Sequence, residues 1–182
     1  MIDYFPQALA FHWRPENDGQ PAHLEGHDAG GWTAWGVTFG TWQSWCIKYG
    51  HPCSLDSFKA LPKDQFIPFY RSGFWNPAGC YALGPCGVQV FDAAVMSSVR
   101  TAVRFLQHCL GVSTDGVLGP LTLAKAEAAD QIALNKALTA EREAFYDASP
   151  DARFFGRGWD RRAEACRVFT AGLIFAQSGE AA

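Results

Sequence analysis

The sequence predicts one compact unit that is mostly α-helical and carries a small β-hairpin. Two long stretches favour helices: residues 85–110 repeat apolar side chains every three or four positions, and residues 121–148 are rich in Ala, Leu and Glu. Residues 32–39 instead suit a strand, with alternate side chains on opposite faces. The chain shows no internal repeat, low-complexity tract or Pro/Gly-rich linker, so one packed unit is expected.

A short helix is expected near the N-terminus. Asp3 can cap it, and Pro6 falls in its first turn, where a missing N–H leaves no hydrogen bond unmade. Its apolar face continues to Trp13, and Pro15 ends it, because the residue before a proline is pushed out of the α region. Glu16 therefore comes just past a helix end, where a carboxyl group can lean over a cleft.

The stretch from residue 13 to residue 38 is more typical of a site than of a core. It combines acidic side chains, two histidines, three tryptophans and a Gly30-Gly31 pair that allows a sharp reversal. Asp28 and Thr33 would flank that reversal. Helix, acid, turn, second acid and strand together describe one wall of a glycosidase cleft, in which one carboxyl protonates the leaving oxygen and another steers water.

More helices are expected along the chain. Gly50 should end one that starts near residue 41, and Ser54 can cap the next. Residues 85–110 give the strongest helical pattern and predict a central buried helix. We interpret Asp92, on its early turns, as a structural hydrogen-bonding residue rather than a catalytic acid.

The C-terminal half is expected to be helical around one turn. Asp115-Gly116 belongs to this turn, and Pro120 can open the helix that follows. Residues 121–148 predict one or two helices, and the last helix is expected after Trp159, with Cys166 on its buried face.

Composition argues against several classes of function. A formal net charge of −3 gives no basic stripe for phosphate contacts, so a nucleic-acid partner is not expected. No run of about eighteen apolar residues exists, so no membrane span is expected. The sequence Met-Ile-Asp-Tyr-Phe-Pro at the start lacks the basic and apolar parts of a secretory signal.

The six cysteines show no Cys-x-x-Cys spacing, which argues against a zinc or thioredoxin site. If oxidised, two pairs would close short loops, and buried free thiols are the alternative. These pairs are Cys46 with Cys53 and Cys80 with Cys86.

A metal hypothesis arises from alternate residues of one loop. Four side chains of this loop could converge on an ion: His23, Glu25, His27 and Asp28. They match no fixed ligand spacing, and hydrated loop histidines are commoner. We therefore expect neither a metal nor another cofactor.

Glu16 and the run Asp28-Ala-Gly-Gly-Trp-Thr33, followed by Trp35-Gly36-Val37-Thr38, resemble a known motif. In glycoside hydrolase family 108, whose members are mostly phage and prophage muramidases, a Glu precedes Asp-x-Gly-Gly-x-Thr-x-x-Gly-Ile-Thr. Later landmarks follow in order, so the resemblance covers nearly the whole chain. They are Tyr70, Trp75, residues 91–95, Leu106-Gln107, Asp115-Gly116, Gly119-Pro120, Thr122, Arg142, Phe145-Tyr146, Gly158-Trp159 and Arg162.

The resemblance implies a lysozyme-like α+β fold with its hairpin near the active site. It implies a catalytic region over residues 1–98 and a helical region over residues 99–182 that carries a peptidoglycan-binding-like motif. It further implies a phage endolysin that is made in the cytoplasm of a host bacterium and acts on the cell wall after release. We expect a monomer whose partner is the glycan strand of peptidoglycan.

The same resemblance implies catalytic roles. Glu16 would be the general acid, held protonated by burial among aromatic rings, while Asp28 and Thr33 would hold the attacking water. The spacing from Glu16 to Asp28 is longer than in the family, so Glu25 is a rival for the acid. Glu16 is preferred because it lies at the end of the first helix. The similar layout in phage lysozymes suggests inversion.

Substrate contacts are expected from aromatic residues and from the C-terminal turn, because sugar C–H faces need flat apolar surface. For Trp75, stacking and packing are equally plausible, and the turn could be a plain connector. The predicted contacts are Trp32, Trp35, Tyr70, Trp75, Asp115 and Gly116.

Two other functions compete with hydrolysis. A noncatalytic wall-binding module would use the turn at residues 115–122 and exposed tryptophans. A lytic transglycosylase would need one acid without a water-positioning Asp, and the presence of both Asp28 and Thr33 counts against it.

Overall fold

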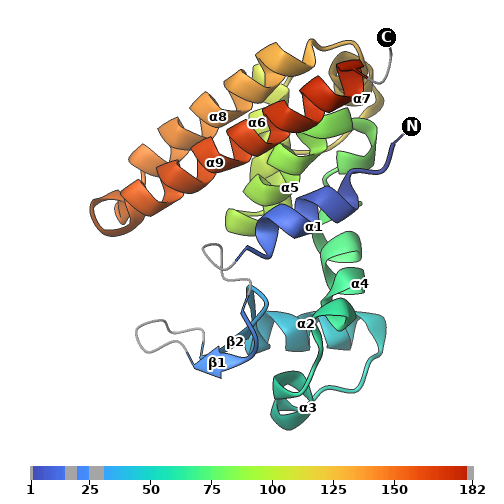
Figure 1. Cartoon of the computed structure of the whole chain (residues 1–182), viewed down its shortest axis with the longest axis vertical. Coiled ribbons are helices and arrows are strands. Elements are labelled where there is room, and N and C mark those ends of the chain that lie inside the picture. The colour runs from blue at the N-terminus through green and yellow to red at the C-terminus, as the bar shows by residue number, and fades with distance from the viewer. Residues whose placement is uncertain (1, 15–19, 25–30, 180–182) are drawn as a thin grey trace. The chain divides into compact units, whose positions relative to one another are not determined.

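The computed structural model describes residues 2–14, 20–24 and 31–179. Within them the chain is mostly helical and has a three-stranded antiparallel sheet, which confirms the predicted α+β class (Figure 1). The elements are α1 (Phe5–His12), β1 (His23–Leu24), β2 (Trp32–Ala34), β3 (Val37–Thr38), α2 (Phe39–Tyr49), α3 (Leu55–Lys59), α4 (Ile67–Tyr70), α5 (Gly87–Met96), α6 (Val99–Cys109), α7 (Pro120–Glu127), α8 (Gln131–Asp147) and α9 (Ala152–Gly179).

The chain packs as two compact units. The first comprises residues 1–8 and 74–182 and is called the helical unit; the second comprises residues 9–73 and is called the hairpin unit. The chain passes from one to the other within α1 and returns through a π-helical turn at Arg71–Trp75. The predicted boundary between residues 98 and 99 separates a catalytic region from a peptidoglycan-binding-like region. It divides the chain by function and not by packing, and it stays a prediction.

Aromatic rings form the core of the hairpin unit. Trp42, on α2, lies 4.7 Å from Phe66 and 5.9 Å from Phe69 between ring centroids, and it stacks on Trp45 at 5.0 Å. Gly50 ends α2 in the left-handed conformation at φ 71°, as expected. Ser54 caps α3 through a reciprocal capping box with Ser57.

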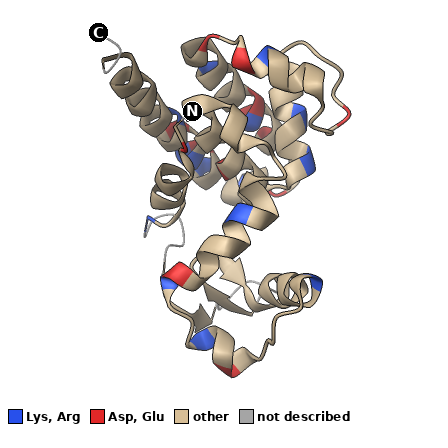
Figure 2. Cartoon of the chain, turned by 90° about the vertical axis from the view of Figure 1, so that its right-hand side faces the viewer, with Lys and Arg blue, Asp and Glu red and all other residues tan. Residues whose placement is uncertain are grey.

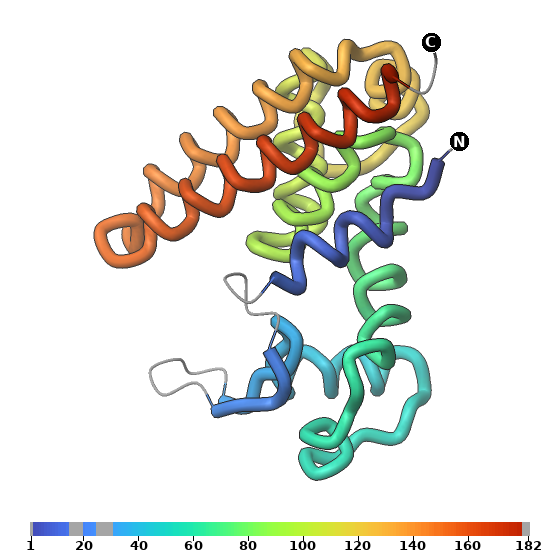
Figure 3. The backbone as a smooth tube through the Cα atoms, in the orientation of Figure 1, coloured from blue at the N-terminus to red at the C-terminus, as the bar shows by residue number. Residues whose placement is uncertain are grey.

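The helical unit is built around α5, on which every residue from Gly87 to Ala94 is buried. Helices α8 and α9 run side by side in opposite directions, which the tube in Figure 3 makes plain. Both α8 and α9 contact α5. The expected central buried helix is therefore present, although it is shorter than predicted.

The helix predicted over residues 85–110 is two helices. Ser97 leaves the helical conformation at φ −126° and ψ −74°, and the Ser98 hydroxyl accepts a hydrogen bond from the Thr101 amide, which starts α6. Apolar residues recur every three or four positions on both sides of this break, so the pattern alone does not reveal it. The predicted single helix was wrong at the position where a serine could act as an N-cap.

The last helix begins earlier than predicted. Helix α9 starts at Ala152, so Trp159 lies inside it rather than ahead of it. Gly156, which is buried, and Gly158, which is exposed, do not interrupt it despite their poor helix propensity.

All six cysteines are free thiols in the structure. In the hairpin unit, burial and then a hydrogen bond with Cys53 raise the pKa of Cys46 to about 11. In the helical unit, the pKa of Cys166 is raised to about 12, and burial is the largest cause. Such thiols are protonated at neutral pH.

Lys and Arg are interspersed with Asp and Glu along the described chain (Figure 2). Among the described helices, none is both long enough and apolar enough to cross a bilayer.

Candidate active site

The predicted strand over residues 32–39 is in fact a hairpin followed by a helix. Strands β2 and β3 pair Thr33 with Thr38 and Ala34 with Val37, and Trp35-Gly36 forms the two-residue turn. Both turn residues have positive φ, 52° for Trp35 and 80° for Gly36, as tight hairpin turns with matching twist require. The prediction of one continuous strand was wrong because the turn needs only two residues.

The backbone carbonyl of Trp35 fixes this turn. It accepts a hydrogen bond from the Trp13 indole N–H at 3.2 Å and another from the Tyr70 hydroxyl at 2.7 Å. Trp35 is the only non-glycine residue with positive φ among the described residues, a conformation that costs roughly 1–2 kcal/mol. Two donors on one carbonyl help to hold the turn in that conformation.

A histidine completes the arrangement. Tyr70 donates its hydroxyl proton to Trp35, so its oxygen accepts from His12 Nε2, 2.7 Å away. The His12 and Tyr70 side chains are buried, and the two rings meet edge to face at 4.7 Å. Sequence reasoning missed His12. A histidine between two apolar aromatic residues at the end of a helix was the available signal.

Gly36 is required by both conformation and space. A Cβ atom there would lie 2.8 Å from His12 Nε2 and 3.1 Å from the Tyr70 hydroxyl oxygen. The turn therefore packs directly against the hydrogen-bonded pair.

Thr33 is held from both sides. It pairs with His23 on β1 and with Thr38 on β3, and its exposed fraction is 6%. The middle strand of a sheet has neighbours on both edges, so the backbone that carries this hydroxyl is well fixed.

Glu16, its rival Glu25 and Asp28 lie outside the described residues. The described residues next to them belong to the framework of the hairpin. Gln20 accepts a hydrogen bond on its carbonyl from the Trp35 amide at 2.7 Å, and Leu24 pairs with Trp32 across β1 and β2.

Two lysines lie over three tryptophans of the hairpin unit. The Lys59 ammonium is 4.0 Å from the Trp32 ring centroid, and that of Lys63 is 4.7 Å from Trp13 and 5.4 Å from Trp35. These are cation–π distances. Trp32 and Trp35 are partly exposed, so the surface beside the hairpin combines flat apolar rings with positive charge.

The two other predicted aromatic contacts are buried. Tyr70 has an exposed fraction of 0% and serves the turn. Trp75, also at 0%, belongs to the helical unit and packs against Phe5 at 5.4 Å and Phe91 at 5.9 Å. Of the two roles considered for Trp75, the structure favours packing.

The turn at Asp115-Gly116 is closed by a buried glutamine. Gln107 donates to the Asp115 carboxylate at 2.8 Å and accepts from the Gly116 amide at 2.8 Å. The hydrogen bond from Gln107, followed by that from the Val117 amide, lowers the pKa of Asp115. These contacts support the connector role, and a substrate contact of either residue stays a prediction.

Asp92 has the structural role predicted for it. Buried on α5, it forms ion pairs with Arg142 at 2.5 Å and with Arg162 at 2.7 Å. Burial alone would lower the pKa of Arg142, but the attraction of Asp92 more than reverses this and the pKa lies above its usual value. The cluster joins α5, α8 and α9.

Of the four residues in the metal hypothesis, only His23 lies in the described chain. Its Nδ1 atom is 2.8 Å from the carbonyl oxygen of Pro21. Within the described ranges, no group of three or more His, Cys, Asp or Glu side chains is arranged to hold a metal ion.

Comparison with known proteins gives two family matches in tandem. Residues 18–97 match the model of Glycosyl hydrolase 108, and residues 101–164 match that of the Predicted Peptidoglycan domain. The first match contains Asp28, Thr33 and the rival acid Glu25, and it begins two residues after Glu16.

Eleven chains of solved structures match this one. One of them is the structure of Brucella abortus SagA, with 28% sequence identity and a TM-score of 0.80, over 93% of this chain and 94% of that chain. The comparison with curated proteins gives no match.

Proposed function

We propose that this chain, in which a region that matches glycosyl hydrolase 108 precedes one that matches a predicted peptidoglycan domain, is a peptidoglycan hydrolase, and we also propose the bond that it cleaves. The proposed target is the β-1,4 linkage between N-acetylmuramic acid and N-acetylglucosamine. Glu16 protonates the leaving oxygen, while Asp28, with the Thr33 hydroxyl, holds the attacking water.

The main support for this proposal is the pair of hydrogen bonds that the Trp35 carbonyl accepts from Trp13 and Tyr70, which we call the clamp. Trp13, three residues before Glu16, bonds to the same turn that leads from β2, where Thr33 lies, to β3. Two described residues that flank the acid-bearing segments in the sequence, Trp13 and Thr33, thus belong to one hydrogen-bonded framework. Catalysis of this kind depends on groups that are already positioned before the substrate binds.

The surface beside the hairpin also suits the substrate. Trp32 and Trp35 offer flat faces to sugar C–H groups, and Lys59 and Lys63 bring positive charge to the same surface. Peptidoglycan strands carry carboxylates, which this charge attracts.

The decisive experiment is mass spectrometry of the fragments released from purified sacculi. The wild-type chain should release muropeptides with free reducing ends. The Glu16→Gln variant should lose about 10²–10⁴-fold of that activity, as is usual for a general acid. Glu25→Gln is the matched control and should stay active. The reverse result would assign the acid to Glu25.

Two other product patterns would contradict the proposal. Anhydro sugars would identify a lytic transglycosylase, and binding to sacculi without any release would identify a wall-binding module. Proton NMR of freshly formed product gives the anomeric outcome, which we propose to be inversion. Turbidity loss of permeabilised bacteria on addition of the purified chain tests the proposed role as a phage endolysin.

A further inference from the structure

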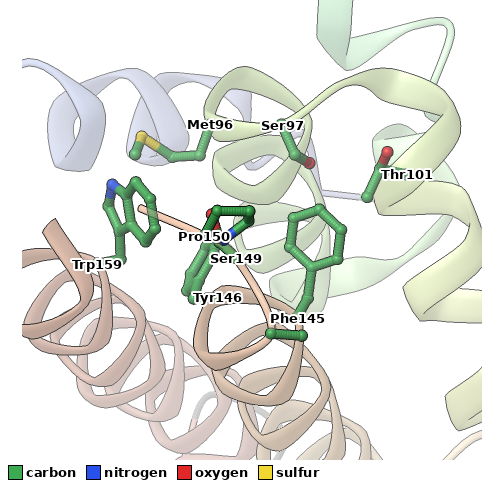
Figure 4. A pocket seen from close by; sticks show the side chains of 9 residues that line it. Met96, Ser97, Thr101, Phe145, Tyr146, Ser149, Pro150 and Trp159 are labelled. Atoms are coloured by element: carbon green, nitrogen blue, oxygen red, sulfur yellow. The ribbon is translucent and has the colours of Figure 1, made fainter. Parts of the chain in front are cut away.

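A hollow of about 520 Å³ lies in the helical unit, and none of its lining residues is one of those assigned above to the chemistry (Figure 4). It is formed between the end of α5 and the start of α6 on one side and α8, α9 and their connection on the other. Its volume is within the range of sites for small organic ligands. The break between α5 and α6 at Ser97 contributes directly to its wall.

Apolar side chains form most of this hollow. Trp159, Tyr146 and Phe145 line it from α8 and α9, and Met96 lies across from Trp159 in Figure 4. The rings of Tyr146 and Trp159 are 5.5 Å apart, and the side chain of Phe145 is 46% exposed. Such walls suit methyl groups and sugar C–H faces.

Three hydroxyl groups line the same hollow with unused hydrogen-bonding capacity. Thr101 accepts from Ser98, and Ser149 accepts from the Asp151 amide, which leaves each hydroxyl proton for a ligand. Ser97 donates to the Ala93 carbonyl and keeps its lone pairs. The hollow thus offers both donors and an acceptor, as an acetamido group requires.

A second, more polar hollow of about 560 Å³ adjoins the first. The two hollows share the lining residues Thr101 and Phe145, and we call the two together the groove along α6 and α8. Arg104 lines the second part beside His108 and Glu141, whose side chains are bonded to each other at 2.7 Å. The groove therefore passes from an apolar part to a part with a guanidinium group.

We propose that this groove binds one peptidoglycan repeat, a disaccharide with its stem peptide. The N-acetyl sugar occupies the apolar part, and a stem-peptide carboxylate meets Arg104 in the polar part. This inference rests on the proposed function, because it takes the wall polymer as ligand, and it deepens that function by assigning a second contact with the same substrate. Residues 101–164, which match the peptidoglycan domain, supply most of the groove.

The sequence offers a direct probe of occupancy. The chain has two methionines, Met1 and Met96, so protein labelled with ¹³C-methyl methionine gives at most two methyl signals. The Met96 signal, identified by its loss in Met96→Leu, should shift when soluble disaccharide-tripeptide is added to the inactive Glu16→Gln, Glu25→Gln chain. A Met96 signal that does not move at saturating ligand would overturn the site.

Charge and wall variants locate the two ends of the ligand. Phe145→Ala should weaken binding of disaccharide-tripeptide about tenfold by calorimetry. Its control is Phe175→Ala, which removes an 83% exposed ring on α9 and should bind as the parent.

Arg104→Glu should weaken binding of the peptide-bearing ligand but leave binding of the peptide-free disaccharide unaffected, with exposed Arg161→Glu as control. Equal weakening of both ligands by Arg104→Glu would overturn the assignment of the peptide end.

The two proposals fail separately. Cleavage of sacculi by the wild-type chain together with an unshifted Met96 signal would reject the groove and keep the hydrolase. A ligand-dependent shift that Phe145→Ala abolishes, without any cleavage by the wild-type chain, would keep the groove and reject the bond proposed for cleavage.

Discussion

The helical unit buries a carboxylate with two guanidinium groups, whereas the hairpin unit buries an imidazole and a phenol around one backbone carbonyl. In the first, Asp92 meets Arg142 and Arg162 and links three helices. In the second, Tyr70 joins His12 to the Trp35 turn. The difference shows two ways to satisfy buried polar groups: long helices position formal charges, and a short sheet relies on hydrogen bonds and closely packed rings.

The largest effect is expected where formal charge is buried. Asp92→Asn keeps the volume but removes the buried negative charge that faces Arg142 and Arg162, so the free energy of unfolding should fall by about 3–5 kcal/mol. Urea unfolding followed by helical circular dichroism measures this. The exposed pair Glu164–Arg167 provides the control, and Glu164→Gln should change stability by about 0.5 kcal/mol or less. Equal effects of the two variants would remove the contrast between buried and exposed charge.

A somewhat smaller effect is expected at the hairpin turn. Gly36→Ala places a Cβ 2.8 Å from His12 Nε2 at a φ of 80°, which should cost about 2–3 kcal/mol. Thermal unfolding of the hairpin variant is compared with that of Gly158→Ala in α9, where nothing lies within 4 Å of the new atom. The control should be neutral or more stable by about 0.5–1 kcal/mol. A harmless Gly36→Ala would show that the turn is not packed as described.

Removal of one hydroxyl group sharpens the comparison further. Tyr70→Phe deprives the Trp35 carbonyl and His12 of a shared partner, so stability should fall by about 1–2 kcal/mol. Tyr81→Phe, at a residue that is 52% exposed, should leave the denaturation midpoint unchanged. Activity on sacculi should also fall in Tyr70→Phe alone, because the turn adjoins Thr33. Normal activity in a stable Tyr70→Phe variant would show that the hydrogen bond from Tyr70 to the Trp35 carbonyl is not needed for catalysis.

The smallest effect concerns alkaline pH. The pKa of Cys166 is raised to about 12 in the folded chain, so its contribution to stability is complete below the ordinary thiol pKa and is lost as pH rises through the folded value. Between pH 7 and pH 10 this thiol should account for roughly 1 kcal/mol of lost stability. Cys166→Ala should lose correspondingly less over that interval. A loss identical to that of the wild-type chain would mean that the thiol ionises normally when folded.

The sequence predicted the helices because caps and apolar periods are local signals. Gly50 and Ser54 mark helix ends by their own chemistry, and both predictions were confirmed. The break at Ser98 and the turn at Trp35 were missed, because each requires only one or two residues inside a continuous pattern.

The candidate site divides in the same way. Thr33 could be singled out from its motif, but the role of His12 depends on Tyr70, which is 58 positions away in the chain. Landmark residues such as Arg142 and Arg162 also looked alike in the sequence, and only packing identified them as partners of Asp92. Long-range pairing of this kind leaves no local trace.

The route of the chain through the two units has a consequence for engineering. Phe5 packs on Trp75 and Phe91 within the helical unit, although residues 9–73 separate them in the sequence. The junction between the two family matches, near residue 98, falls between α5 and α6, which pack on each other. Chimeras spliced there would divide a single hydrophobic core, so neither fragment is a transplantable part.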